Sequence, residues 1–416
     1  MIARFRINLR LFVALCLPLS AATVKPESVG FSGERLVRIH EAMQRHIEAH
    51  DFSGAVTVVA RRGQIAWFDA QGLMDIEANK PMPRDAIFRI FSMSKPITGA
   101  AILMLVEEGK VRLNDPVSKF IPDFKDAKVA ILEDSPGDGP ASGPVKFYTI
   151  PAAREITVQD LLTHVSGLAS GGKASGLDVT SLLDMVGSRT LADLMPKFGP
   201  APLDFQPGSR WSYSPLAGFD TLGRVVEVVS GMSYDQFLKE RIFTPLGMKN
   251  TGFHPGDDRR SSVVTAYHRA DRALTRTEHP NRLQSTTYFS GAGGLVSTAE
   301  DYAQFAQMLC ARGQWNGARL LSPKTVDLMS SVFVADTVPG LSAGQSFGLS
   351  VRVVTDPIAS GQRVSKGSFG WDGAYGTHFW VDPVEKVVGV MMIQTDNPDH
   401  VADRDFENAA MQAMVE

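Results

Sequence analysis

The stretch Phe91-Ser92-Met93-Ser94-Lys95-Pro96, followed by the apolar run Ile97–Val106, decides how the rest of the chain is interpreted. Residues 97–106 are apolar on nearly every side, which is typical of a helix buried all round. Ser92 and Lys95 are three positions apart, so their side chains share one face of that helix. A serine hydroxyl becomes an effective nucleophile when a neighbour takes its proton, and a desolvated lysine can do so. The stretch therefore predicts an activated serine at the start of a buried helix.

The position of Ser92 at the beginning of the helix also suits catalysis. Pro96 fits a first helical turn, where its missing N–H costs little, and the helix dipole there favours developing negative charge. The pattern Ser-x-x-Lys has low specificity by itself, and the chain contains a second copy, Ser170-Gly171-Gly172-Lys173. That copy lies in a Gly/Ser-rich stretch with no apolar helix after it, so we interpret it as a loop. The alternative for Ser92 is an ordinary helix cap.

The segments on either side of the helical region have the pattern of strands. Residues 32–49 predict an amphipathic helix capped by Ser32. Strand-like runs at 54–60 and 64–68 flank Arg61-Arg62-Gly63, which indicates a hairpin. Near the C-terminus we expect four strands, at 347–354, 364–369, 377–381 and 386–394, and a final helix over 401–414.

These elements predict an α/β (α+β) fold with an antiparallel sheet built from both chain ends and flanked by helices. We expect residues 23–90 and 296–416 to form this discontinuous domain, and residues 91–295 to form a mainly helical domain inserted in it. Pro- and Gly-rich residues 124–156 indicate a long surface excursion. The active site is expected in the cleft between the two domains.

Composition and the N-terminus define the expected setting. The chain has 416 residues, 44% of them hydrophobic and 21% charged, with a net charge of −3, which gives no general attraction for nucleic acid. Residues 1–22 resemble a signal peptide, with three arginines up to Arg10, the apolar run Leu11–Leu19 and small residues that suit cleavage after Ala22. We expect a periplasmic or secreted protein without stable membrane insertion, because the run is too short to span a bilayer. The alternative is an apolar helix that is retained.

No metal or cofactor is expected. Cys16 lies in the signal-like segment, so the mature chain would keep only Cys310, in an apolar stretch typical of a buried thiol. His46 and His50 are four positions apart on a predicted helix, but the segment lacks a zinc motif and is interpreted as a solvated helix face.

Two further segments complete a recognisable pattern. Trp211-Ser212-Tyr213-Ser214-Pro215 precedes the helix-like Leu216–Val229, and Phe369-Gly370-Trp371-Asp372-Gly373-Ala374 lies in the C-terminal strand region. With the Ser92 segment, they resemble the three motifs of the serine β-lactamase and penicillin-binding protein superfamily. More specifically, the chain is similar to the family VIII carboxylesterases, which are related to class C β-lactamases. The resemblance implies the β-lactamase/transpeptidase-like fold.

The resemblance also implies roles for individual residues. Ser92 would form the acyl-enzyme, Lys95 would activate it, and Tyr213 would relay the proton to the leaving alcohol and then activate water. The backbone N–H groups of Ser92 and Ala374 would form the oxyanion hole. The substrate pocket is expected to involve Trp371, Asp372, Gly373, Tyr375 and His378.

Two departures from the β-lactamase pattern favour an ester substrate. Pro215 replaces the asparagine of the second motif, which would hold an acylamino side chain, and Trp371-Asp372-Gly373 replaces the Lys-Thr-Gly of the third. The second change removes the cation expected to hold a substrate carboxylate. We therefore expect a serine carboxylesterase for small neutral esters with short to medium acyl chains. Asp372 also departs from the Trp-Gly-Gly common in family VIII, and the charge of the pocket lip stays open.

Several alternatives stay open. The same three residues would serve a weak class C-like β-lactamase, a D-alanyl peptidase or an acyltransferase similar to the statin side-chain acylating enzyme. A Ser-His-Asp hydrolase is disfavoured because no Gly-x-Ser-x-Gly motif is present, and His164 is interpreted as a hydrogen-bonded structural residue. The non-enzymatic alternative is a penicillin-binding or sensing module acylated at Ser92 without turnover. Natural substrate and oligomeric state are not predicted.

Overall fold

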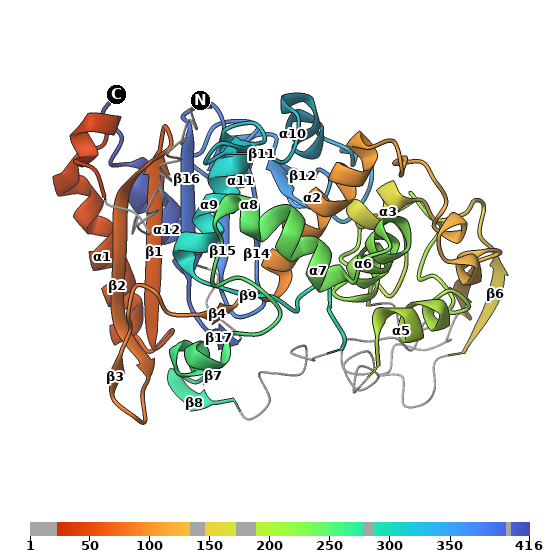
Figure 1. The fold of residues 1–416 in the computed structure, drawn as a ribbon, viewed down its shortest axis with the longest axis horizontal. Helices are drawn as coiled ribbons and strands as arrows, with labels where there is room; N and C mark the ends of the chain where they lie inside the picture. The colour runs from red at the N-terminus through yellow and green to blue at the C-terminus, as the bar shows by residue number, and fades with distance from the viewer. Residues whose placement is uncertain (1–22, 134–145, 172–188, 278–286, 397–400) are drawn as a thin grey trace, which may run out of the picture.

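A large antiparallel sheet joins the two ends of the chain in the computed structural model (Figure 1), which describes residues 23–133, 146–171, 189–277, 287–396 and 401–416. The sheet has eight strands in the order β12-β13-β14-β15-β16-β1-β2-β3. The central strand β1 pairs on one side with its hairpin partner β2 and on the other with β16. The strands are β1 (Gly54–Arg61), β2 (Gln64–Asp75), β3 (Lys80–Pro81), β12 (Gln345–Phe347), β13 (Arg352–Val354), β14 (Phe369–Asp372), β15 (His378–Asp382) and β16 (Val387–Met392).

Both faces of the sheet are covered by helices, which explains why every residue of β1 is buried. Alternate side chains of the strand face opposite layers. Val56 and Val58 join the main core on the face covered by α9 (Ala299–Cys310), and Ala55 and Val59 pack beneath α1 (Gly33–Glu48) and α12 (Ala402–Met411). The main core continues from the sheet into the helical half of the molecule.

The helical half surrounds α2 (Ser94–Glu107), whose residues from Ser94 to Leu105 are all buried. Helix α6 packs against α2, α3, α5 and α7. The remaining helices are α3 (Val158–Leu162), α5 (Leu191–Phe198), α6 (Ala217–Ser230), α7 (Tyr234–Leu238), α8 (Thr244–Leu246), α10 (Pro323–Met329) and α11 (Pro357–Ser360), with a π-helical turn at Lys239–Phe243 between α7 and α8. Among the described residues, no helix is long and apolar enough to cross a membrane.

Smaller strand pairs lie outside the large sheet. Strand β4 pairs with β9, so the segments before α2 and before α9 lie side by side. These strands are β4 (Phe88–Arg89), β5 (Lys128–Leu132), β6 (Phe147–Pro151), β7 (Tyr267–Ala270), β8 (Ala273–Arg276), β9 (Val296–Ser297), β10 (Gln314–Trp315), β11 (Ala318–Arg319) and β17 (Thr395–Asp396).

Several expectations are confirmed, among them the antiparallel sheet, the Ser32-capped helix, the first hairpin and the buried helix. Two boundaries were wrong. The single strand expected at 347–354 is two strands, because the chain reverses at Gly348 and at Ser350, whose φ is 74°. The strand expected at 364–369 begins only at Phe369. The excursion expected at 124–156 contains the β5–β6 hairpin, and its residues 134–145 lie outside the described residues. The expected signal segment lies outside the described residues and stays a prediction.

Candidate active site

Ser92 lies in a single 3₁₀ turn, Phe91–Met93, that leads directly into α2. Phe91 has a φ of 41°, in the left-handed region that non-glycine residues rarely adopt. Its ring stacks on that of Tyr375, with 4.4 Å between ring centroids. Such backbone strain persists where the surrounding structure fixes it, and it concentrates at functional sites. The turn holds the half-buried Ser92 hydroxyl at the helix N-terminus.

The three residues expected to carry the chemistry lie together. The Ser92 Oγ is 3.1 Å from the Lys95 Nζ and 2.6 Å from the Tyr213 Oη. The Lys95 Nζ also lies 4.9 Å from the centroid of the Tyr213 ring. One hydroxyl oxygen therefore contacts two groups that can exchange protons with it. Lys95 is three residues from Ser92 in the sequence, and Tyr213 is 121 residues from it.

Lys95 is completely buried, and its Nζ has two further partners. It donates to the carbonyl oxygens of Pro215, at 2.8 Å, and Ala292, at 2.9 Å. A neutral amine has two N–H groups and a lone pair, whereas an ammonium has three N–H groups. Because two N–H groups of Nζ are bound to carbonyl oxygens, the group that faces the Ser92 Oγ is the lone pair in the neutral amine and the third N–H in the ammonium. Lys95 can therefore take up and return the serine proton without moving.

Asp220 on α6 holds the segment that supplies the Ala292 carbonyl. Its buried carboxylate accepts hydrogen bonds from the Tyr288 hydroxyl at 2.6 Å, the Ser290 hydroxyl at 2.7 Å and the Ala292 N–H at 3.0 Å. Burial raises the pKa of Asp220, and these hydrogen bonds oppose the rise. Residue 292 is thus fixed through its N–H to Asp220 and through its carbonyl to Lys95. Sequence reasoning missed both Asp220 and Ala292.

The end of β14 lies against the nucleophile. Gly373 follows this strand, and a Cβ at this position would lie 2.5 Å from the carbonyl oxygen of Ile90. Only glycine therefore lets the strand approach Ser92 this closely. The next residue, Ala374, is exposed, and within the described residues neither its N–H nor that of Ser92 has a hydrogen-bond acceptor. These are the two N–H groups expected to form the oxyanion hole.

Trp371 closes the site from the sheet side. Its ring lies 5.6 Å from the ring of Tyr213 and 5.1 Å from that of Phe347. Tyr213 also lines a hollow of about 480 Å³, together with Trp211, Arg210 and Leu132. Of the residues expected in the pocket, Trp371 thus lies against the Tyr213 ring, and Gly373 and Tyr375 lie against Ile90 and Phe91, the two residues before Ser92.

Asp372 and His378, also expected in the pocket, lie on the opposite face of the sheet. Side chains alternate along a strand, so Asp372 points away from the side that Trp371 occupies. Its carboxylate accepts hydrogen bonds from Arg352 at 2.7 Å and from the His378 Nδ1 at 2.5 Å, and the His378 Nε2 donates to Glu407 on α12 at 3.1 Å. Burial raises the pKa of Asp372, but Arg352 and His378 hold it below its usual range. The third motif therefore presents no free acid to a substrate.

One group of described residues, Asp372, His378 and Asp403, has oxygen and nitrogen atoms close enough to share a metal ion. Both nitrogens of His378 already face carboxylates, which only accept hydrogen bonds, so both carry hydrogens. A metal ligand needs a free lone pair on the ring. In this arrangement His378 serves as the cation of the group.

The protonated His378 leads to a pH prediction. Burial lowers the pKa of His378, but hydrogen bonds and charges from Asp372 and Glu407 outweigh it and raise the pKa to about 10. Because this exceeds the unfolded value of about 6.5, the stabilisation is complete below about pH 6.5 and is lost as the pH rises toward 10. We expect the melting temperature of the wild type to fall toward that of His378→Gln over this interval. If the difference in melting temperature between the two proteins stayed constant from pH 6 to 10, His378 would not be charged.

Comparison with known proteins identifies the family and several relatives of this chain. Residues 39–413 match the family described as Beta-lactamase. A Mycobacterium tuberculosis protein, Rv1367c, is 36% identical over 373 residues, which cover 87% of this chain and 89% of that protein. Esterase EstB of Burkholderia gladioli is 28% identical over 403 residues, covering 91% and 95% of the two chains. The structure of EstCE1, described as a hydrolase with promiscuous acyltransferase activity, matches with a TM-score of 0.77 and 26% identity over 91% of this chain and 99% of its own.

Proposed function

The chain belongs to the Beta-lactamase family, and from this premise we propose that it is a serine carboxylesterase that cleaves small neutral esters through an acyl-enzyme on Ser92. The observation that carries the proposal is the contact of one hydroxyl oxygen, the Ser92 Oγ, with both the Lys95 Nζ and the Tyr213 Oη. The likeness to EstB and EstCE1, whose names describe an esterase and a hydrolase, supports the choice of reaction.

Acylation begins when Lys95, as a neutral amine, takes the proton of Ser92. The serine oxygen attacks the ester carbonyl carbon, and the oxyanion is stabilised by the N–H groups of Ser92 and Ala374. As the tetrahedral intermediate collapses, the bond to the alcohol oxygen breaks. Tyr213 gives its phenolic proton to that oxygen and recovers one from Lys95, whose Nζ lies against its ring. The alcohol leaves and the acyl group stays on Ser92.

Deacylation repeats these steps with water. Tyr213 first passes its phenolic proton to Lys95 and then, as a phenolate, takes a proton from water, and the resulting hydroxide attacks the acyl carbon. The second tetrahedral intermediate expels the Ser92 oxygen, which recovers its proton from Lys95. The carboxylic acid is released and the starting proton arrangement returns.

An ester is favoured over a β-lactam because the third motif supplies no cation for a substrate carboxylate. Trp371 occupies the place of the lysine in the third motif, and the carboxylate of Asp372 is bound to Arg352 and His378. A lost hydrogen bond to a charged group is worth about 1.5–3 kcal/mol, or a factor of about 10 to 100. The loss falls on an anionic substrate and leaves a neutral ester unaffected.

The test is hydrolysis of p-nitrophenyl acetate, butyrate and octanoate beside a chromogenic cephalosporin. We expect kcat/KM for the best ester to exceed that for the cephalosporin by at least about tenfold. Ser92→Ala measures the background with each substrate. If the wild type opened the cephalosporin faster than it cleaved any ester, the β-lactamase alternative would replace the esterase.

A further inference from the structure

His164 holds the backbone on both sides of Tyr213. Its carbonyl oxygen accepts the N–H of Ser212 at 3.0 Å, and its ring Nδ1 accepts the N–H of Ser214 at 3.1 Å. The His164 ring also lies against the Tyr213 ring, with 4.7 Å between centroids. A single buried residue thus contacts the residue before Tyr213, the residue after it and the phenol ring itself.

We propose that His164 is a positioning residue that fixes the Tyr213 hydroxyl on the Ser92 Oγ through these three contacts. The proposal rests on the proposed function, because that function gives Tyr213 its role in proton transfer. His164 itself is assigned no contact with substrate. Tyr213 lies between a turn and α6, in a segment where no regular secondary structure fixes its backbone. An external clamp is therefore needed to hold its hydroxyl 2.6 Å from Ser92.

The protonation state of His164 suits a clamp and excludes a proton-transfer role. Because Nδ1 accepts a hydrogen bond from a backbone N–H, the ring hydrogen must be on Nε2. Burial, and then the positive charge of Lys95, lower the pKa of His164 well below its ordinary value. The ring therefore stays neutral and adds no second charge beside Lys95. A protonated ring would also lose the lone pair that holds Ser214.

His164 is kept despite two local costs. Its φ is 58°, in the left-handed region, and within the described residues its Nε2 has no hydrogen-bond partner. An unpaired buried donor costs about 1–3 kcal/mol. Aromatic rings fill the space around the imidazole, with Phe347 at 5.1 Å, Phe219 at 5.2 Å and Trp211 at 6.1 Å between centroids. Strain and an orphaned donor at one residue beside a catalytic side chain indicate that its other contacts are needed.

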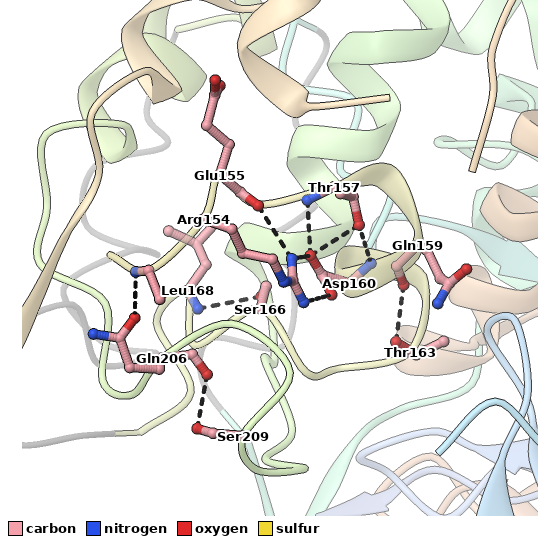
Figure 2. Close-up of polar contacts among 11 residues, drawn as sticks. Arg154, Glu155, Thr157, Gln159, Asp160, Thr163, Ser166, Leu168, Gln206 and Ser209 are labelled. Carbon is pink, nitrogen blue, oxygen red and sulfur yellow. Dashed lines mark hydrogen bonds and ion pairs between the residues drawn. The ribbon is translucent and has the colours of Figure 1, made fainter. Parts of the chain in front are cut away.

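The short helix α3 places His164. Figure 2 shows a reciprocal cap at its start, where the Asp160 carboxylate accepts the Thr157 N–H at 2.8 Å and the Asp160 N–H donates to the Thr157 hydroxyl at 3.2 Å. Arg154 grips the same carboxylate through two nitrogens, at 2.5 and 2.8 Å. The chain leaves the helix at once, and the Val165 N–H returns to the Asp160 carbonyl at 3.0 Å. His164 is thus fixed in a tight reversal between these contacts.

Three substitutions separate the clamp from general destabilisation. His164→Asn tolerates a positive φ and keeps an acceptor at the position of Nδ1, whereas His164→Leu has no acceptor and His164→Gln carries its acceptor one bond too far out. His50 has the same φ of 58° on the exposed end of α1, so His50→Leu carries the same backbone penalty away from the site. We expect kcat for p-nitrophenyl butyrate to fall about 100-fold in the Leu and Gln variants with little change in KM. His164→Asn should stay within about tenfold of the wild type, and His50→Leu should lower only the melting temperature.

A double-mutant cycle with Tyr213→Phe decides whether His164 acts through Tyr213. If it does, adding His164→Gln to Tyr213→Phe should lower kcat by no more than about twofold to threefold, far less than in the wild-type background. An equal loss in both backgrounds would overturn the clamp and leave the proposed function intact, as would equal activity of the Asn and Gln variants. If Tyr213→Phe alone kept full activity, the role of Tyr213 in the proposed function would fail, and the clamp with it.

Discussion

Replacing Ser92 with alanine is expected to reduce esterase turnover to near the uncatalysed rate. Ser92 carries the acyl group in every step of the proposed reaction, and the Lys95 Nζ and the Tyr213 Oη converge on its oxygen. Removing a nucleophile from a cooperating group costs about 10³- to 10⁶-fold in kcat, because the remaining members cannot act without it. We expect kcat for p-nitrophenyl butyrate to fall at least about 10³-fold, while the melting temperature changes little.

The chain supplies a matched control for this experiment. Ser170 begins the second Ser-x-x-Lys match, and among the described residues its hydroxyl has only a long contact, 3.5 Å, to the carbonyl of Leu168. Ser170→Ala should keep wild-type activity. An organophosphonate ester should add one covalent adduct to the wild type and to Ser170→Ala, and none to Ser92→Ala. Full activity in Ser92→Ala, or an adduct that persists in it, would place the nucleophile elsewhere.

The core helix and hairpin were predictable because their physical cause is local. A run that is apolar on all sides has few alternatives to a buried helix, and α2 is buried from Ser94 to Leu105. The strand boundaries near the C-terminus were less predictable. The apolar residues around 347–354 fit one strand. The reversal at Ser350 depends on a positive φ, which a serine in the sequence does not predict. Its N–H bonds to the Leu162 carbonyl, a contact far away in sequence.

The candidate site divides in the same way. Ser92 and Lys95 were found through their spacing and the apolar helix that follows them, and Tyr213 through the resemblance of its segment to a family motif. The groups that orient them include backbone carbonyls, such as that of Ala292, which carry no residue signature. His378 shows the converse, since its type suggested a pocket residue, whereas strand alternation and Glu407 place it on the opposite face of the sheet. Only the three-dimensional register decides between these two locations.

Replacing Lys95 with methionine is expected to cost nearly as much as replacing Ser92. Methionine approximates the length and volume of lysine, so the fully buried site stays filled, but it can neither donate to the Pro215 and Ala292 carbonyls nor accept the serine proton. Loss of a general base costs about 10²- to 10⁴-fold. We expect a fall of at least about 10³-fold in kcat for p-nitrophenyl butyrate, since the same nitrogen also supports Tyr213. A fall of less than about tenfold would transfer the role of base to Tyr213 alone.

Chemical rescue separates the two functions that Lys95 could have, proton acceptor and fixed positive charge. Lys95→Ala leaves a cavity that adjoins the half-buried Ser92, into which a small primary amine can diffuse. If Lys95 is the base, added methylamine or ethylamine should restore part of the lost rate in proportion to the concentration of the neutral amine. Rescue should then increase with pH until the amine is fully deprotonated. If instead the rescued rate followed the ammonium form and declined over that range, Lys95 would act by its charge, and the proton of Ser92 would have to pass directly to the Tyr213 oxygen 2.6 Å away.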